Sequence, residues 1–81
     1  MEAIGKVISF FAKINVAAVD LSADLKVGDK VAFRGHTTDF EQVIESMQID
    51  REEVEEAKAG DSVGLKVSDR VRPGDELFRV E

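Results

Sequence analysis

The sequence predicts an all-β domain, a small barrel or sandwich, and two observations support this prediction. The run 62–67 alternates Val63, Leu65 and Val67 with small or polar residues, and a period of two is typical of a half-buried strand. A turn pattern of glycine, then aspartate, then an apolar run occurs three times, at Gly28-Asp29, Gly60-Asp61 and Gly74-Asp75. Three strands that begin from one kind of turn indicate a small all-β fold.

The two residues of each turn give it a physical basis. Glycine adopts positive φ without steric cost, and the aspartate carboxylate can accept hydrogen bonds from nearby backbone amides. Within the strand 62–67, Gly64 has no side chain, so another chain segment can pass close to it. We therefore expect structural roles for the turn residues Gly28, Asp29, Gly60, Asp61, Gly74 and Asp75.

Length and composition limit the chemistry. The 81 residues are expected to form one domain, residues 1–81, near the lower size at which a single core suffices. There is no cysteine and His36 is the only histidine, so we expect no disulfide, no metal site and no thiolate nucleophile. We also expect no cofactor. The scarcity of Asn and Gln beside many charged residues hints at a thermophilic source.

The charge balance and the apolar stretches bear on partners and location. The net charge of −6 argues against strong non-specific binding to nucleic acid. No apolar stretch reaches the ~20 residues of a membrane span. Residues 1–12 lack the basic start and the cleavage site of a signal peptide. The expectation is a cytoplasmic protein that has no contact with a membrane.

The first half of the chain divides into strands and turns. The stretch 3–21 is rich in Val, Ile and Phe and is too long for one strand, so we expect a hairpin that breaks near Ala12-Lys13, although no Asn-Gly or Asp-Gly turn is present. The polar segment 20–30 predicts a loop. Residues 31–33 predict a short strand, and 36–39 a polar turn. Near the C-terminus, 71–75 predicts a turn and 77–80 the last strand.

The stretch 39–60 fits two interpretations. Phe40, Val43, Ile44 and Met47 have the spacing of an amphipathic helix. Thr38, with Glu41 three residues later, fits a capping box. On local pattern alone, a helix that is closed by Gly60 is favoured. A strand needs a bulge near 45–46 to turn Met47 inward.

Several short motifs resemble those of a known family. They are Ile4-Gly5-Lys6-Val7, Leu25-Lys26-Val27-Gly28-Asp29, Ser46-Met47-Gln48, Ala57-Lys58-Ala59-Gly60-Asp61-Ser62-Val63-Gly64-Leu65 and Gly74-Asp75. In this order they resemble the second domain of translational GTPases, typified by elongation factor Tu. The whole chain looks closer still to small stand-alone translation elongation factor-like proteins, which have a similar stretch at 35–40.

This resemblance implies a closed antiparallel Greek-key β-barrel of six or seven strands. It also implies a strand over 40–49 with Met47 in the core, then a charged loop over 51–56 with a short extended piece at Val54. On this basis we predict strand, against the local helical pattern. The GTPase domain is absent and there is no phosphate-binding loop, so GTP binding by this chain alone is not expected.

The polar cluster at 36–39 is the first candidate for binding. A histidine, two hydroxyls and a carboxylate on one loop could hold a ligand or position a partner. The alternative is a turn whose side chains satisfy its own backbone. Phe40 is expected to anchor the loop by inserting its ring into the core. The candidate binding residues are His36, Thr37, Thr38 and Asp39.

No residue is a convincing catalytic candidate. The glutamates of 52–56 fit a solvated loop better than an acid–base pair. In elongation factor Tu, this barrel holds the aminoacylated end of transfer RNA. The resemblance implies an Asn at the position of Ser62 and an acidic residue at the position of Ser46. Neither is present, so the resemblance does not support an aminoacyl pocket in this chain. Lysines and arginines are spread along the chain without forming a basic stripe.

Three functions follow from these features. The first is a non-enzymatic, translation-associated binding module that meets the ribosome or RNA. The alternative is a protein-docking accessory subunit, for example beside a collagenase-like peptidase, because a similar barrel closes the C-terminus of some of those enzymes. An enzyme in its own right is the third and least supported.

Overall fold

The computed structural model describes residues 2–80, which form ten β-strands and no helix. The strands are β1 (Glu2–Phe11), β2 (Val16–Leu21), β3 (Leu25–Lys26), β4 (Lys30–Arg34), β5 (Asp39–Val43), β6 (Met47–Ile49), β7 (Glu52–Val54), β8 (Glu56–Ala57), β9 (Ser62–Lys66) and β10 (Glu76–Arg79). The predicted all-β class is confirmed. Within residues 2–80, no helix is long and apolar enough to cross a membrane.

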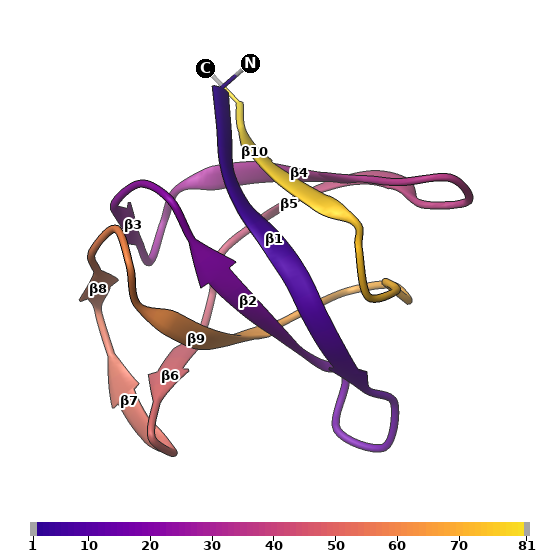
Figure 1. Ribbon diagram of the computed structural model, residues 1–81. Helices are drawn as coiled ribbons and strands as arrows, with labels where there is room; N and C mark the ends of the chain where they lie inside the picture. The colour runs from indigo at the N-terminus through magenta and orange to yellow at the C-terminus, as the bar shows by residue number, and fades with distance from the viewer. Residues whose placement is uncertain (1, 81) are drawn as a thin grey trace.

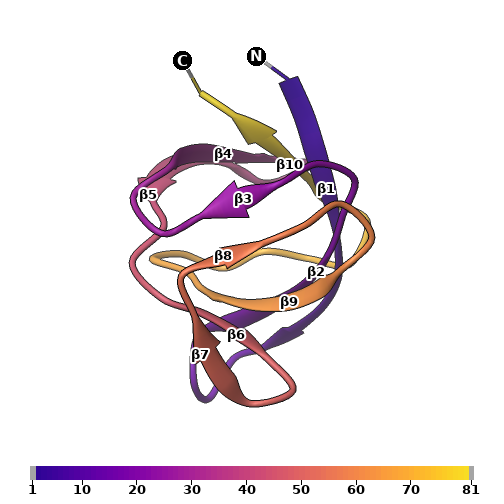
Figure 2. The same cartoon turned by 90° about the vertical axis from the view of Figure 1, so that its left-hand side faces the viewer.

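Eight strands form one antiparallel sheet in the order β5-β4-β10-β1-β2-β9-β6-β7. The sheet curls strongly, and the first and last strands pair near its middle, so the two ends of the described chain lie together (Figure 1). A second sheet contains only β3 and β8. It lies across one side of the curled sheet, between the β4–β5 hairpin and β9 (Figure 2).

The predicted closed barrel of six or seven strands is wrong in closure and in strand number. The edge strands β5 and β7 do not pair with each other. The turn after β3 occupies the gap instead: Val27 N donates to Glu55 O, Gly28 N donates to Ile44 O, and Ile44 N donates to Asp29 O, all at 2.8–2.9 Å. Backbone groups near the gap are thus satisfied by a turn rather than by a continuous strand ladder. The result is a curled half-barrel.

One apolar core fills the inside of the curl. The alternating residues Val63, Leu65 and Val67 are buried, as their spacing predicts. Phe33 is fully buried and stacks on the half-buried Phe40, with ring centroids 5.1 Å apart. This contact anchors the start of β5 against β4.

The stretch 39–60 contains the four strands β5 to β8 and no helix, so the strand prediction made against its local helical pattern is confirmed. Met47 is buried, as expected, whereas Val43 is 47% exposed and does not share a face with Ile44. The expected long strand over 40–49 is interrupted at 44–46, because the backbone of Ile44 bonds the turn after β3. The expected loop at 51–56 is instead the second strand of a hairpin with β6, followed by β8.

The β1–β2 hairpin matches the expected break near Ala12-Lys13. The strands end at Phe11 and start again at Val16, and Ile14 N donates to Phe11 O at 3.2 Å within the turn. Asn15 has φ 52°, a conformation that Asn tolerates better than most residues. Asn15 therefore supplies the turn signal that an Asn-Gly or Asp-Gly pair would otherwise provide.

The three Gly-Asp turns have the same hydrogen bonds. In each, the aspartate N–H donates to the carbonyl three residues earlier, and its carboxylate accepts from the N–H of that same residue at 2.8–3.1 Å. The first residues of the three turns are basic: Lys26, Lys58 and Arg72. The glycine that precedes each aspartate has φ between 95° and 99°, which is the geometry of a type II turn.

Candidate docking surfaces

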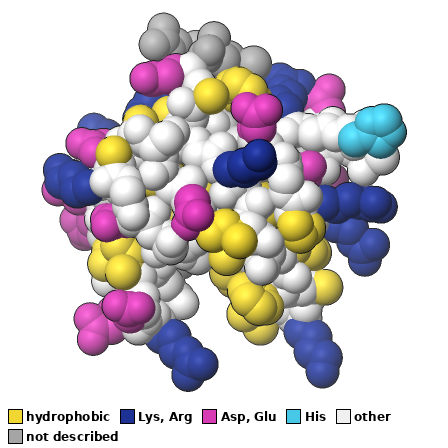
Figure 3. All heavy atoms as spheres, viewed as in Figure 1, with side chains coloured by type: hydrophobic (Ala, Val, Ile, Leu, Met, Phe, Trp, Pro, Cys, Tyr) yellow, Lys and Arg dark blue, Asp and Glu magenta, His cyan; other side chains and the backbone are white. Residues whose placement is uncertain are grey.

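The predicted binding loop 36–39 lies at the tip of the β4–β5 hairpin, where Figure 3 shows the single histidine projecting from the molecule. The loop is closed by a hydrogen bond from Gly35 N to Thr38 O at 2.8 Å. His36 and Thr37 are exposed, Thr38 is buried, and Asp39 forms an ion pair with Arg34. Half of the cluster is thus engaged in holding the hairpin together.

Three of the four predicted binding residues border one hollow. Thr37, Thr38 and Asp39 border a hollow of about 270 Å³, but His36 does not. The other side of this hollow is the segment 69–72, which contributes Asp69, Arg70 and Arg72. Sequence distance hid this juxtaposition, because the segment that follows β9 runs back past the β4–β5 hairpin.

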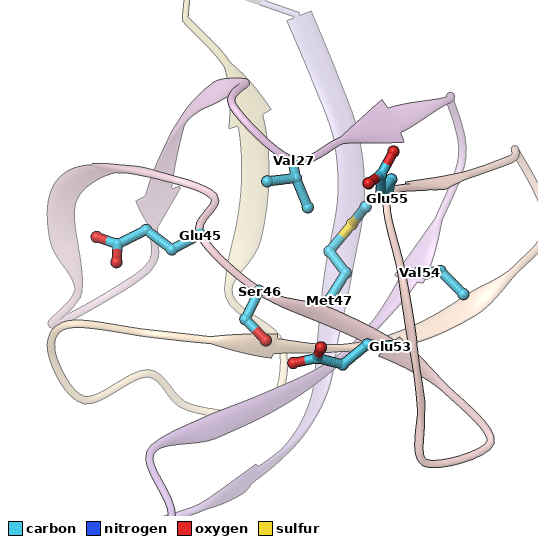
Figure 4. Close-up of a pocket in the computed structure, with 7 residues that line it drawn as sticks. All are labelled: Val27, Glu45, Ser46, Met47, Glu53, Val54 and Glu55. Atoms are coloured by element: carbon cyan, nitrogen blue, oxygen red, sulfur yellow. The ribbon is translucent and has the colours of Figure 1, made fainter.

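A second hollow lies beside β6 and β7 and includes two of the glutamates that sequence analysis assigned to a solvated loop, Glu53 and Glu55. Glu45 also borders it, whereas Glu52 and Glu56 do not. Figure 4 shows that the three carboxylates do not converge on one point. Within residues 2–80, no group of three or more His, Asp or Glu side chains could hold a metal ion. This hollow does not have the geometry of an acid–base or metal site.

A third hollow is apolar, and sequence analysis missed it. Phe11 is 51% exposed and Ile14 is 57% exposed, although most large hydrophobic side chains are buried. Hydrophobic side chains gather on this face over the ends of β1 and β2 that meet the hairpin turn (Figure 3). Phe11 and Ile14 border a groove of about 450 Å³. We call it the hairpin groove.

Two small residues on paired strands border the hairpin groove. Ala18 of β2 pairs with Gly64 of β9, and both border the groove. A Cβ atom on Gly64 would lie 3.2 Å from Val16 Cγ1, so there is little room for a side chain at this point. The absence of a side chain at Gly64 allows this close approach, as its position in the strand predicts.

The walls of the groove are held in place by hydrogen bonds. Lys66 Nζ donates to Ile14 O at 3.2 Å, and Val67 N donates to Asn15 O at 2.9 Å. These bonds tie the β1–β2 turn to the end of β9. On the opposite side, the β6–β7 turn contributes Asp50 and Arg51. The groove therefore combines an apolar interior with a partly charged rim, as protein interfaces do.

A β-bulge explains why the alternation of β1 did not reveal the groove. Val7 faces the core, so strict alternation would turn Phe11 inward as well. The register shifts between Val7 and Ser9, and the extra residue Ile8 reverses the faces that follow it. Phe11 then pairs with Val16 on the outer face. Nothing in the sequence marks Ile8 as the bulged residue.

Segments of several curated proteases are similar in sequence to this chain. No family model matches the chain. It is 45% identical over 76 residues to an uncharacterised protease of Methanocaldococcus jannaschii, which covers 93% of this chain and 19% of the protease. It is 32% identical over 80 residues to each of two Porphyromonas gingivalis collagenases. These alignments cover 96% of this chain, 22% of the first collagenase and 19% of the second. The chain thus spans about a fifth of the length of these curated relatives.

Solved structures agree with the sequence comparison. Two crystal structures of the C-terminal domain of a Geobacillus thermoleovorans protein described as a U32 peptidase superpose with TM-scores of 0.91 and 0.92. Their sequence identities are 26% and 25%. The alignments cover 96% and 99% of this chain, and 99% and 93% of the domain structures. The similarity therefore extends over nearly the whole of each domain structure.

The resemblance to translation elongation factors is corrected by these comparisons. The relatives are named as proteases, collagenases and a U32 peptidase. The motifs that carried the resemblance include all three Gly-Asp turns, whose residues serve to turn the backbone and cap it. Such motifs report a kind of turn in a small β-fold, and they do not specify the protein family.

Proposed function

We propose that this chain is a non-catalytic accessory β-domain that docks on the catalytic part of a collagenase-like peptidase. One observation carries the proposal: nearly the whole chain matches a segment that makes up only about a fifth of a protease or collagenase. The matched segment in those relatives therefore has a large peptidase body attached to it. A peptidase body of that kind is therefore the partner that we propose for this domain.

The side chains of this domain support a role without catalysis. The Ser62 hydroxyl donates a hydrogen bond to the Asp20 carboxylate across β2 and β9. His36, the only imidazole, lies at the tip of the β4–β5 hairpin and does not border the groove that Ser62 lines. A nucleophilic hydroxyl needs a base and an orienting group within reach, and this arrangement does not bring the three together.

The hairpin groove is the docking surface that we propose. Exposed aromatic and aliphatic side chains around a pocket are typical anchors of protein interfaces. The sheet edges are less suited. Gln42 forms hydrogen bonds from β5 to the end of β9 and to Ser68, and β7 contains Glu52 and Glu53. Charged edge strands discourage pairing with a further strand. A face rather than an edge therefore receives the peptidase.

The test uses the M. jannaschii protease after deletion of the segment that this chain matches. We expect the purified chain to bind the truncated protease saturably in isothermal titration calorimetry. Phe11→Ser together with Ile14→Ser should weaken binding by at least about tenfold, because hot-spot residues contribute roughly 2 kcal/mol or more each. Val43→Ser is the matched control, since Val43 is exposed but lies outside the groove.

Two results would contradict this proposal. One is the absence of binding to the truncated protease. The other is equal affinity of the wild-type chain and the Phe11→Ser, Ile14→Ser variant. Transfer RNA is titrated in parallel, and saturable RNA binding in place of protease binding would replace the peptidase proposal with a nucleic-acid one.

A further inference from the structure

We propose that the hollow between the β4–β5 hairpin and the segment 69–72 binds the C-terminal carboxylate of a peptide. This site is separate from the hairpin groove and does not depend on docking to a peptidase. It is bordered on one side by Thr37, Thr38, Asp39 and Phe40, and on the other by Asp69, Arg70 and Arg72.

The first argument concerns the two arginines. Arg70 and Arg72 are exposed, and within residues 2–80 neither guanidinium forms an ion pair or a hydrogen bond. By contrast, Arg34 and Arg79 are both paired with carboxylates. An unpaired guanidinium presents a planar set of donors that matches a carboxylate. Two such guanidinium groups at one hollow can bind an anionic ligand.

The second argument concerns the acids of the same hollow. Asp39 is already paired with Arg34, and Asp69 Oδ1 accepts a hydrogen bond from Arg70 N at 2.7 Å. Neither carboxylate neutralises Arg70 or Arg72, but both keep the total charge of the hollow low. Both guanidinium groups therefore remain available to a ligand. A carboxylate can accept two parallel hydrogen bonds from one guanidinium group.

The third argument concerns size and polarity. At about 270 Å³ the hollow lies just below the range of pockets that take drug-sized ligands, so it suits the end of a chain. Six of the seven residues that border it are polar or charged, and the seventh is Phe40, whose ring stacks on Phe33. A polar hollow of this size fits the terminal carboxylate of a peptide better than an apolar side chain.

The backbone around the hollow is well fixed. Asp75 Oδ2 accepts a hydrogen bond from Arg72 N at 2.8 Å, and the Asp75 side chain is buried. Gly35 N donates to Thr38 O on the opposite side. A site on two anchored turns loses little conformational entropy when the ligand binds. The Thr37 hydroxyl, which is exposed, can donate a further hydrogen bond to the ligand.

The experiment titrates the isotopically labelled full chain with an acetylated peptide that ends in leucine with a free carboxylate. We expect saturable amide shifts at Thr37, Phe40, Arg70 and Arg72. The same peptide with a C-terminal amide, and an amidated peptide with an internal glutamate, should bind at least about tenfold more weakly, because charge-assisted hydrogen bonds to the terminal carboxylate are lost or misplaced. Inorganic phosphate tests for an unselective anion site.

Two variants complete the test. Arg70→Gln with Arg72→Gln should remove the shifts while it leaves amide resonances of the core unchanged. Arg51→Gln is the control, because Arg51 is an exposed arginine outside this hollow. The proposal is overturned if the free-acid peptide produces no saturable shifts, if the amidated peptide or phosphate binds as well, or if the double variant retains binding. Failure here leaves peptidase docking untouched, because no peptidase is present.

Discussion

The side-chain amide of Gln42 is bonded to the backbone of Ser68. Ser68 N donates to Gln42 Oε1 at 2.8 Å, and Gln42 Nε2 donates to Lys66 O at 2.8 Å. Gln42 lies on β5, the edge strand of the curled sheet, whereas Lys66 is the last residue of β9 and Ser68 follows it. The Gln42 side chain therefore both donates and accepts a hydrogen bond, as the backbone of a neighbouring strand would. It connects β5 to a part of the chain that is distant from β5 in the strand order.

Replacement of Gln42 by Ala should destabilise the fold by about 1–3 kcal/mol, because two backbone groups lose their partner. The free energy of unfolding from urea titration measures this. Gln48→Ala is the matched control, since Gln48 is exposed and its side chain makes no hydrogen bond within residues 2–80. Equal stabilities of the two variants would show that the Gln42 bridge does not stabilise the fold.

Gly35 is required by the buried carboxylate of Asp75. A Cβ on residue 35 would lie 2.6 Å from Asp75 Cγ, and Asp75 cannot move freely because it caps Arg72 N. Gly35→Ala should therefore destabilise by roughly 1–3 kcal/mol, a typical cost of overpacking. Thermal unfolding compares it with Gly64→Ala, whose closest contact would be 3.2 Å. A smaller loss for Gly35→Ala than for Gly64→Ala would argue against this account.

Substitutions at Gly60 measure the energetic cost of positive φ without a steric clash. Its φ is 95°, and a Cβ there would meet nothing within 4 Å, so a side chain would cost conformational energy without a clash. Gly60→Val should destabilise by about 1–3 kcal/mol, and Gly60→Asn should cost less, because Asn tolerates positive φ. Differential scanning calorimetry gives both values. An unchanged melting temperature for Gly60→Val would mean ordinary backbone geometry at residue 60.

Arg51 is a position where the natural residue is not the most stable choice. The β6–β7 hairpin has a two-residue turn, Asp50-Arg51, and both residues have positive φ. Asp-Gly is a preferred pair for such a turn. Arg51→Gly should therefore stabilise the fold by roughly 0.5–1 kcal/mol, as relief of the left-handed conformation outweighs the extra chain entropy. Denaturant titration that shows a loss of stability would refute this expectation.

Sequence patterns predicted the fold where one local rule dominates. The alternation of Val63, Leu65 and Val67 and the repeated Gly-Asp turns indicate an all-β structure, and the positive φ of the three glycines follows from the turn chemistry. Local pattern failed at 39–60, where the spacing of Phe40 and Met47 imitates a helix. Pairing of β5 with β4 and of β6 with β9 overrides that spacing.

The candidate surfaces were harder to predict, for a different reason. The hairpin groove depends on a bulge at Ile8 that turns Phe11 outward. The hollow between the β4–β5 hairpin and the segment 69–72 depends on two loops that are far apart in sequence. A one-residue register shift moves every following side chain to the other face. The family resemblance failed because its motifs are turn signals that unrelated β-domains can share.

The most direct test of the docking proposal maps where the peptidase body contacts this chain. Amide shifts of the labelled chain are recorded while the truncated M. jannaschii protease is added. The account predicts shifts or line broadening that are concentrated at Phe11, Ile14, Ala18 and Gly64, which border the hairpin groove. Perturbations that avoid these residues, or that are absent at saturating protease, would contradict it.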